Sequence, residues 1–189
     1  MGRFSKIAQD AFKSFQVDAG VLLKNFDPAN PELVDADIIC ATTGGINPTC
    51  VPEYRDNGED VDNVPAGMME LMEIVRWATG LGFTALNTTP ETVRMALGAA
   101  DIGAENGAII PRMELKDTDF ADIWWVGDRS DGGLVAICLK NALSTSGLSL
   151  QTTKDGKGQL SVTLSGHYSI KDQDSVPMEF YVQEGEDEE

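Results

Sequence analysis

The chain has 189 residues, 42% of them hydrophobic and 24% charged, which is typical of one globular domain with its own core. Its formal net charge of −17 argues against a protein that grips DNA or an anionic membrane, although it allows a surface that DNA passes without sticking. The sequence has no apolar run near the roughly 20 residues of a membrane span and no signal-peptide core, so we expect a soluble protein made in the cytosol.

The first 15 residues carry apolar side chains at helical spacing with polar side chains opposite, so we expect an amphipathic helix or arm over residues 1–15. This helix is expected to pack either on its own domain or on a neighbour. Residues 16–23 follow as a first predicted strand, with apolar side chains around Gly20. The apolar helix positions are Phe4, Ile7, Ala8, Ala11, Phe12 and Phe15.

Two apolar segments, residues 38–42 and 49–54, flank a pair of glycines and are predicted to form a hairpin that turns at Gly44-Gly45. Pro48 and Pro52 remove backbone donors from the second segment, which is typical of an edge strand. An open edge strand invites pairing with another chain, and here that pairing could be its purpose.

Three cysteines are too few and too scattered for a disulfide framework or a metal site. Cys40 and Cys50 lie at equal distances from Gly45, so the predicted hairpin could bring them opposite each other. Cytosolic thiols normally stay reduced, and two small buried residues are therefore the preferred interpretation.

Residues 53–65 differ more in composition from their surroundings than any other segment inside the chain, because they contain five acidic residues and only one basic residue, Arg55. We expect a long solvated or interface loop here. A calcium site is the alternative, but the EF-hand pattern fails because Gly58 stands where a ligand is required. The carboxylates of this predicted loop are Glu53, Asp56, Glu59, Asp60 and Asp62.

A methionine-rich apolar patch at residues 68–75 leads into a strand predicted over residues 77–86, and it serves either as core filler or as a contact surface. The clearest helix signal follows this strand. Thr89 can cap the helix, Pro90 suits its first position, and apolar residues over the next ten positions line one face. Such a short helix is suited to lying across a sheet.

The strongest signal of burial is a β-hairpin of residues 120–126 and 134–139 around a turn rich in Gly and Asp. Both arms are apolar on both faces, which predicts cover on both sides. Adjacent Trp124 and Trp125 must point to opposite faces, so a second apolar surface is needed, from the helix at residues 89–100 or from a neighbouring subunit. The core residues of this hairpin are Ile123, Trp124, Trp125, Val135 and Ile137.

Residues 159–170 alternate between apolar and polar side chains, which predicts a strand with one core face and one small polar face. Its partner at residues 148–150 would join it through a three-residue loop at 154–156, which pairs Leu150 with Leu160. The small polar face consists of Gln159, Ser161, Thr163, Ser165 and His167.

Together these elements predict a mainly β fold of two packed antiparallel sheets, sandwich or barrel-like, with a flanking α-helix and a short N-terminal helix. We expect one β-rich domain over residues 16–182, ending in a strand at residues 177–182. The acidic residues 183–189 are expected to form a disordered tail.

His167 is the only histidine, and a hydrolytic triad can be drawn with Ser165 and either Asp172 or Asp174. Residues two apart on a flat strand hold their side chains roughly parallel, and no oxyanion-hole turn adjoins the serine, so a polar surface position is the better interpretation. The sequence also has no phosphate-binding loop and no cluster at metal spacing. We therefore expect no enzyme, no cofactor and no metal site.

A resemblance to a known family rests on six segments taken together, since no single motif is specific. These segments are DIICATTGGI at 37–46, NGEDVDN at 57–63, DFADIWWVGD at 119–128, NALSTSG at 141–147, GKGQ at 156–159 and GHY at 166–168. In combination they resemble the major tail tube proteins of long-tailed bacteriophages, and the likeness covers about residues 16–182.

The resemblance implies a structural subunit of the virion tail, assembled in the host cytoplasm. Six copies would form a ring, one sheet of each lining the lumen, and rings would stack into a tube around a tape-measure protein before double-stranded DNA passes. Tail-tip or baseplate and tail-terminator proteins are the other expected partners. By this analogy the acidic loop at residues 53–65 contacts the adjacent ring, and the small polar face from Gln159 to His167 is a candidate lining of the lumen.

The excess of negative charge suits such a conduit, because phosphates and carboxylates repel one another over about a Debye length, roughly 8 Å at physiological salt. The alternative is a stand-alone β-sandwich binding module, for example one that recognises carbohydrate or another group on a host surface. Such a module would expose aromatic side chains in a groove or in loops. Trp77, Trp124 and Trp125 all fall in predicted strands, which favours the tail-tube interpretation.

Overall fold

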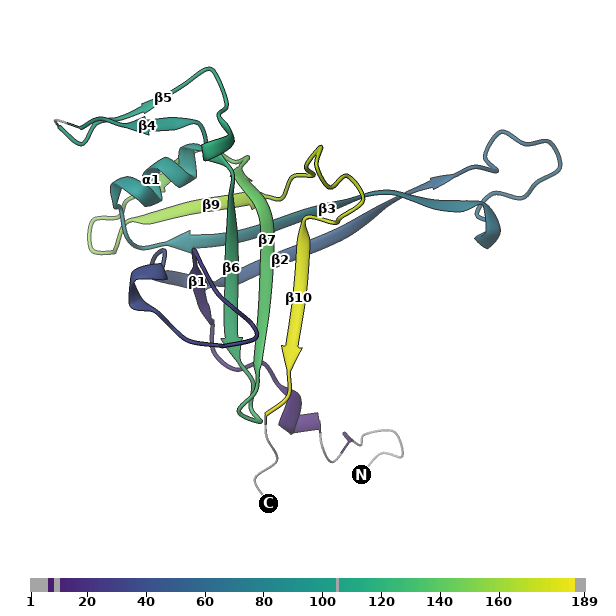
Figure 1. The fold of residues 1–189 in the computed structure, drawn as a ribbon, viewed down its shortest axis with the longest axis horizontal. Helices are drawn as coiled ribbons and strands as arrows, with labels where there is room; N and C mark the ends of the chain where they lie inside the picture. Colours follow the sequence, from purple (N-terminus) through teal and green to yellow (C-terminus); the bar gives the residue numbers. More distant parts are fainter. Residues whose placement is uncertain (1–6, 9–10, 105, 186–189) are drawn as a thin grey trace.

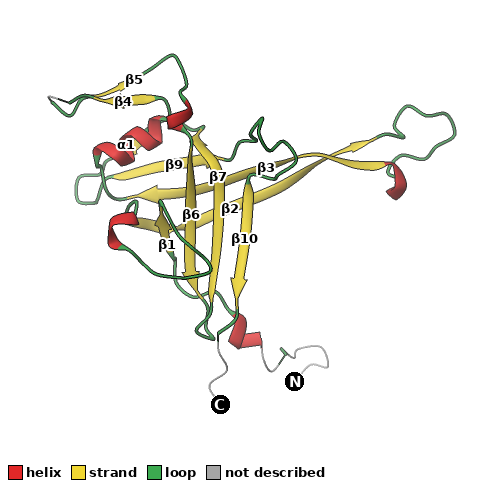
Figure 2. Ribbon diagram, viewed as in Figure 1, coloured by secondary structure: helices red, strands yellow, loops and turns green. Residues whose placement is uncertain are grey.

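The computed structural model describes residues 7–8, 11–104 and 106–185, which form ten strands, one α-helix and four short 3₁₀ helices (Figures 1 and 2). The strands are β1 (Val21–Leu23), β2 (Thr42–Asp56), β3 (Met72–Ala85), β4 (Ala100–Ile102), β5 (Ile109–Pro111), β6 (Ala121–Asp128), β7 (Leu134–Ser144), β8 (Ser149–Gln151), β9 (Gln159–Ser165) and β10 (Met178–Gln183). The helix α1 spans Pro90–Leu97, and the 3₁₀ helices span Ala11–Ser14, Asp35–Asp37, Met69–Leu71 and Asp117–Asp119.

The predicted mainly β, antiparallel fold with a flanking helix is confirmed. Eight strands form one continuous sheet in the order β1-β6-β7-β9-β3-β2, with β10 beside β7 and β8 beside β9, while β4 and β5 form a separate pair. The sheet is continuous because β7 pairs with β6 and β10 along most of its length and with β9 through Leu143 and Ser144. In Figure 1, β6, β7 and β10 run steeply across β9, β3 and β2, so the sheet has two halves that meet at β7.

The core draws its side chains from both halves of the sheet. The alternation predicted for β9 is confirmed, since Leu160, Val162 and Leu164 are buried and the residues between them are exposed. Fully burying one aliphatic side chain stabilises a fold by about 1.5–3 kcal/mol, so each of these three side chains contributes appreciably to stability. Other core side chains are Leu22, Leu81, Phe83, Trp125, Ile137 and Leu139, with Ala96 from α1.

The central hairpin forms as predicted, and its two tryptophans do lie on opposite faces. Trp125 belongs to the core, is only 8% exposed, and donates a 2.9 Å hydrogen bond from Nε1 to the carbonyl of Ala19. Trp124 is half-buried on the other face, with its ring centroid 5.7 Å from those of Phe26 and Tyr181. The prediction that α1 covers this face was wrong, because the segment after β1 and strand β10 supply its aromatic partners. Cover by a neighbouring subunit, the alternative, stays a prediction.

The predicted hairpin turn at Gly44-Gly45 was also wrong. Strand β2 continues through both glycines and pairs along its length with β3, with a register shift between Thr43 and Ile46. The two glycines have φ values of 76° and 81°, which a β-bulge accommodates as readily as a turn does. Cys40 and Cys50 therefore do not face each other across a hairpin, and both are free thiols.

Helix α1 has the ends that its sequence predicts. The hydroxyl of Thr89 accepts a hydrogen bond from the backbone N–H of Thr92, and Pro90 occupies the first turn. Gly98 ends the helix at a positive φ of 77°. The small β4–β5 pair that follows was not predicted, because each of its strands has only three residues. Within the described residues no helix is long and apolar enough to cross a membrane.

Both ends of the chain differ from the predicted boundaries. Among the described N-terminal residues, only Ala11–Ser14 are helical, as a 3₁₀ turn, and the rest of the predicted amphipathic helix at residues 1–6 and 9–10 lies outside the described residues. At the other end, Gln183 belongs to β10, so the last strand begins and ends one residue later than predicted. Residues 186–189 of the predicted disordered tail lie outside the described residues.

Candidate assembly surfaces

The outer ends of β2 and β3, with the loop that joins them, project from the body of the molecule as a long two-stranded ribbon (Figure 1). We call residues 51–75 the arm. An isolated two-stranded ribbon is marginally stable at best in water, and contiguous exposed apolar surface usually marks a contact site. The arm exposes eight large apolar side chains: Val51, Tyr54, Val61, Met68, Met69, Met72, Ile74 and Val75.

Two charged pairs join the strands in and next to the arm. Arg76 binds Glu53 through two hydrogen bonds of 2.6 and 2.7 Å, and Arg55 lies 2.7 Å from Glu73. The hydrogen bond from Arg76 lowers the pKa of Glu53, and the hydrogen bond from Arg55 lowers the pKa of Glu73. These pairs are solvent-exposed, so they align the strands more than they stabilise the fold. Because strand β2 includes Glu53 and ends at Asp56, the predicted loop at residues 53–65 begins only after Asp56.

The five predicted loop carboxylates have different environments. The carboxylate of Asp56 accepts hydrogen bonds from the N–H groups of Gly67, at 2.6 Å, and Gly58, at 2.8 Å, and these bonds lower its pKa. Asp56 thus closes the base of the loop and Glu53 pairs with Arg76. Three carboxylates remain at the exposed tip: Glu59, Asp60 and Asp62. Within the described residues no group of three potential metal ligands is found.

The predicted small polar face is shorter than its sequence pattern suggested. Gln159, Ser161 and Thr163 are exposed on β9, but Ser165 is half-buried and its hydroxyl lies 3.0 Å from that of Thr145. His167 lies beyond the end of the strand, with Nδ1 3.2 Å from the carbonyl oxygen of Asn141. The alternation of small polar residues continues past the point where the β pairing stops, so the sequence predicted a longer strand than the structure contains.

The pairing predicted between Leu150 and Leu160 is confirmed. The connection between them is longer than predicted, however, because β8 ends at Gln151 and β9 begins only at Gln159. Gly156 does not adopt the left-handed conformation that the proposed three-residue loop required. Leu150 itself is exposed, so this edge of the sheet adds to the uncovered apolar surface.

Two long strands leave an edge open within the described part of the chain. Strand β2 pairs with β3 alone, and β10 pairs with β7 alone. Phe180 and Val182 of β10 are exposed and lie opposite Ile137 and Val135 of β7 in the register, so the apolar face of the core continues to the open edge. Edges of this kind are available for pairing or packing with a second chain.

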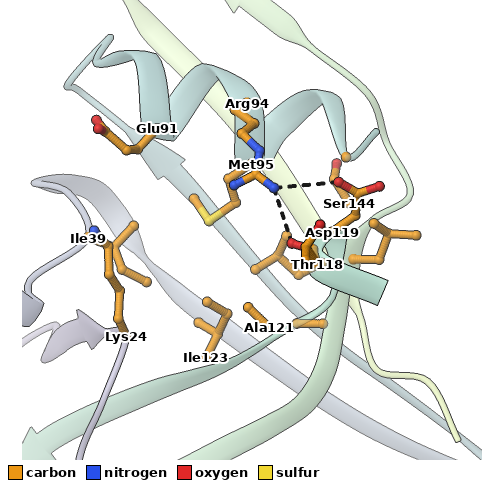
Figure 3. Close-up of a pocket in the computed structure, with 14 residues that line it drawn as sticks. Lys24, Ile39, Glu91, Arg94, Met95, Thr118, Asp119, Ala121, Ile123 and Ser144 are labelled. Atoms are coloured by element: carbon orange, nitrogen blue, oxygen red, sulfur yellow. Dashed lines mark hydrogen bonds and ion pairs between the residues drawn. The ribbon is translucent and has the colours of Figure 1, made fainter. Parts of the chain in front are cut away.

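A pocket of about 310 Å³ lies under α1, bounded by the 3₁₀ helix Asp117–Asp119 and by both halves of the sheet (Figure 3). We call it the α1 pocket. Apolar side chains line its interior, and four charged residues, Lys24, Glu91, Arg94 and Asp119, stand among its lining residues. Sequence reasoning missed this pocket, because its lining comes from segments far apart in the chain. The apolar lining includes Ile39, Met95, Ile123, Leu143 and Leu164.

A buried carboxylate holds the wall of the α1 pocket together. The side chain of Asp119 is fully buried, with an oxygen 2.5 Å from Nη2 of Arg112 and 3.5 Å from Nη2 of Arg94. Its other oxygen accepts a 2.9 Å hydrogen bond from the N–H of Lys116. Nε of Arg112 also lies 2.9 Å from Asp101 of β4. The network therefore ties the β4–β5 pair and the 3₁₀ helix to α1.

Asp119→Asn is expected to lower the free energy of unfolding by about 1–3 kcal/mol at pH 7, because the guanidinium groups of Arg112 and Arg94 lose a buried charged acceptor. Burial alone raises the pKa of Asp119, but the Lys116 N–H and the Arg112 guanidinium outweigh it and hold the pKa below the ordinary value. The stabilisation is therefore present above about pH 4 and is lost as the pH falls through the folded-state pKa.

Urea unfolding of the Asp119→Asn protein and the wild type between pH 7 and pH 2 measures this effect. Asp117→Asn is the matched control, because Asp117 is exposed in the same 3₁₀ turn. We expect the difference between Asp119→Asn and the wild type to shrink toward zero in acid. A difference that stays constant with pH would show that the carboxylate charge does not stabilise the wall.

Comparison with protein-family models and with curated protein sequences found no match for this chain.

Proposed function

We propose that this chain is the structural subunit of a phage tail tube, which assembles into stacked hexameric rings whose lumen conducts double-stranded DNA. The arm carries this proposal. It projects from the body, exposes eight large apolar side chains, and has carboxylates but no cation at its tip. Because this ribbon leaves its apolar side chains exposed in the monomer, it is suited to packing against a neighbouring subunit.

The arrangement of the sheet supports the same proposal. Its two halves meet at β7 and enclose a common core, with α1 beside them, in keeping with the two packed sheets and flanking helix expected of a tube subunit. The open edges of β2 and β10 lie in different halves of the sheet. A subunit with two such edges can contact a neighbour on each side, as closure of a ring requires.

The charge of the chain fits a conduit that DNA passes without binding. The formal net charge is −17, and carboxylates repel phosphates over roughly 8 Å at physiological salt. In this proposal the exposed polar face of β9, from Gln159 to Thr163, contributes to the lumen because it offers neither cations nor large apolar side chains. The tape-measure protein, the tail-tip or baseplate proteins and the tail terminator are the proposed partners in the virion, and we propose no catalytic role.

Negative-stain microscopy and sedimentation of the purified, concentrated protein test this function. We expect rings or tubes to appear as the concentration rises, or when a tail-initiating complex is supplied. Stable monomers under all of these conditions would contradict the proposal and would leave the stand-alone binding module as the alternative. The tryptophans lend that module no support, since Trp125 is buried and Trp77 and Trp124 are half-buried.

A further inference from the structure

We infer that the tip of the arm of one copy docks into the α1 pocket of a second copy. We call residues 57–71 the arm tip. The inference rests on the proposed function in one respect, that copies of this chain assemble with one another. The resemblance to tail tube proteins already implies that the loop at residues 53–65 contacts the adjacent ring, and the new element is the receiving surface, the α1 pocket.

The α1 pocket has the size and lining for a few apolar side chains. Its volume of about 310 Å³ lies at the lower end of the range of about 300–1,000 Å³ that ligand pockets occupy. Figure 3 shows Met95 of α1, Ile39 and Ile123 converging on the space beneath the helix. A narrow projecting element can enter such a space, whereas a broad partner surface cannot.

The arm tip presents side chains that suit this pocket. Met69 is 80% exposed and Met68 is also exposed, and both precede strand β3 at the end of the ribbon. Methionine is unbranched and flexible, so it fills irregular apolar cavities that stiffer side chains leave empty. In the monomer these two side chains lie in water, and docking would remove them from it.

Charge favours the same pairing. The arm tip contains four carboxylates and no cation, since residues 57–71 include Glu59, Asp60, Asp62 and Glu70. The α1 pocket is lined by Lys24, which is exposed, and by Arg94, whose side chain is 38% exposed. In a chain with only 14 basic residues and a net charge of −17, two cations beside one apolar pocket form an uncommon attraction for an acidic segment.

The acidic groups of the pocket do not cancel this attraction. Asp119 is fully buried and lies 2.5 Å from Arg112, which compensates its charge inside the wall, while Arg94 lies farther from it, at 3.5 Å. Glu91 is exposed on α1, but in Figure 3 its carboxylate points away from Arg94. Within the described residues Glu91 forms no ion pair with Arg94 or Lys24, so it neutralises neither cation directly.

The positions of the two surfaces require that the contact join different copies. In Figure 1 the arm extends to one end of the longest axis of the molecule, while α1 lies toward the other end. The arm therefore points away from the pocket of its own chain. A contact between two different surfaces is heterologous, so it repeats from copy to copy and builds rings or filaments.

Two complementary variants test this docking. In the first, deletion of residues 59–71 leaves Asn57-Gly58 as a two-residue turn between the paired residues Asp56 and Met72, so the chain keeps its pocket and loses its arm tip. In the second, Ala121→Trp places a large side chain at an exposed position that lines the pocket, so the chain keeps its arm and loses its pocket. Ala29→Trp, at an exposed position that does not line the pocket, is the matched control.

Sedimentation velocity then distinguishes the outcomes. We expect Ala121→Trp to stay monomeric where the wild type and Ala29→Trp assemble, and a mixture of the two complementary variants to form a one-to-one complex. Assembly of Ala121→Trp at wild-type concentrations, or a mixture without a complex, would overturn the docking. A wild type that never assembles would contradict the proposed tube function instead, while the mixture would still report on the docking.

A second pocket variant, Lys24→Glu, keeps the docking testable if Ala121→Trp misfolds. Lys24→Glu changes an exposed side chain and leaves the apolar lining intact. We expect it to weaken the one-to-one complex with an intact arm about tenfold, because a like charge then faces the acidic arm tip. Unchanged association of Lys24→Glu, measured with the wild-type unfolding midpoint retained, would also overturn the docking.

Discussion

The substitution Trp125→Ala is expected to lower the free energy of unfolding by about 3–5 kcal/mol, which is the range for removing a large aromatic side chain from a core. Trp125 packs in the core cluster with Ile137, its register partner on β7, and Leu164 of β9. The substitution also removes the 2.9 Å hydrogen bond to Ala19, which leaves that carbonyl without its indole donor. A protein of ordinary stability has about 5–15 kcal/mol in total, so the substitution removes a large share of the stability.

Trp124→Ala is the matched control, because it removes the same side chain from the neighbouring position. Trp124 is half-buried against Phe26 and Tyr181 on the other face of the sheet, so we expect a clearly smaller loss. Urea unfolding followed by far-UV circular dichroism compares the two variants. Equal losses would mean that the outer aromatic cluster stabilises the fold as much as the core does.

Deletion of residues 59–71 is expected to abolish tube formation while the monomer stays folded. These residues contribute no side chain to the core cluster, and the deletion leaves the β2–β3 register intact up to the pair of Asp56 and Met72. Shortening the loop lowers the free-energy cost of closing it by up to about 2 kcal/mol, so the free energy of unfolding should remain equal or rise slightly. Microscopy reports on tubes and urea unfolding reports on the monomer.

Asp60→Lys provides a milder version of the same experiment. It changes one charge at the exposed arm tip and keeps the length of the loop. We expect fewer and shorter tubes with an unchanged unfolding midpoint, because a cation then approaches a surface that receives carboxylates. Wild-type tube yield from both the deletion and Asp60→Lys would mean that the arm tip takes no part in assembly.

The sequence by itself determined the elements whose signals are local or strictly periodic. Thr89 and Pro90 marked the start of α1, because capping and ring geometry act within one turn of helix. The alternation around Leu160 and Val162 identified β9 and its core face, because a strand turns successive side chains to opposite sides. The run of apolar residues at positions 120–126 and 134–139 likewise identified the central hairpin and placed Trp124 and Trp125 on different faces.

Only the tertiary structure decided where those faces find their partners. Gly44-Gly45 allows a turn and a bulge equally, and the long ladder between β2 and β3 selects the bulge. The same ladder extends strand β2 to Asp56 and strand β3 back to Met72, which turns an acidic loop into a projecting arm. Neither outcome is encoded locally, because the cross-strand partners lie 16 or more residues apart.

The candidate surfaces show the same division. The carboxylates of residues 53–65 are visible in the sequence, but which of them close the loop and which reach the tip depends on partners such as Gly67 and Arg76. The α1 pocket could not be predicted from the sequence, because it joins Lys24, Met95 and Leu164 from three distant segments. Short-range chemistry thus fixes the elements of this protein, while long-range pairing fixes the surfaces through which we propose it assembles.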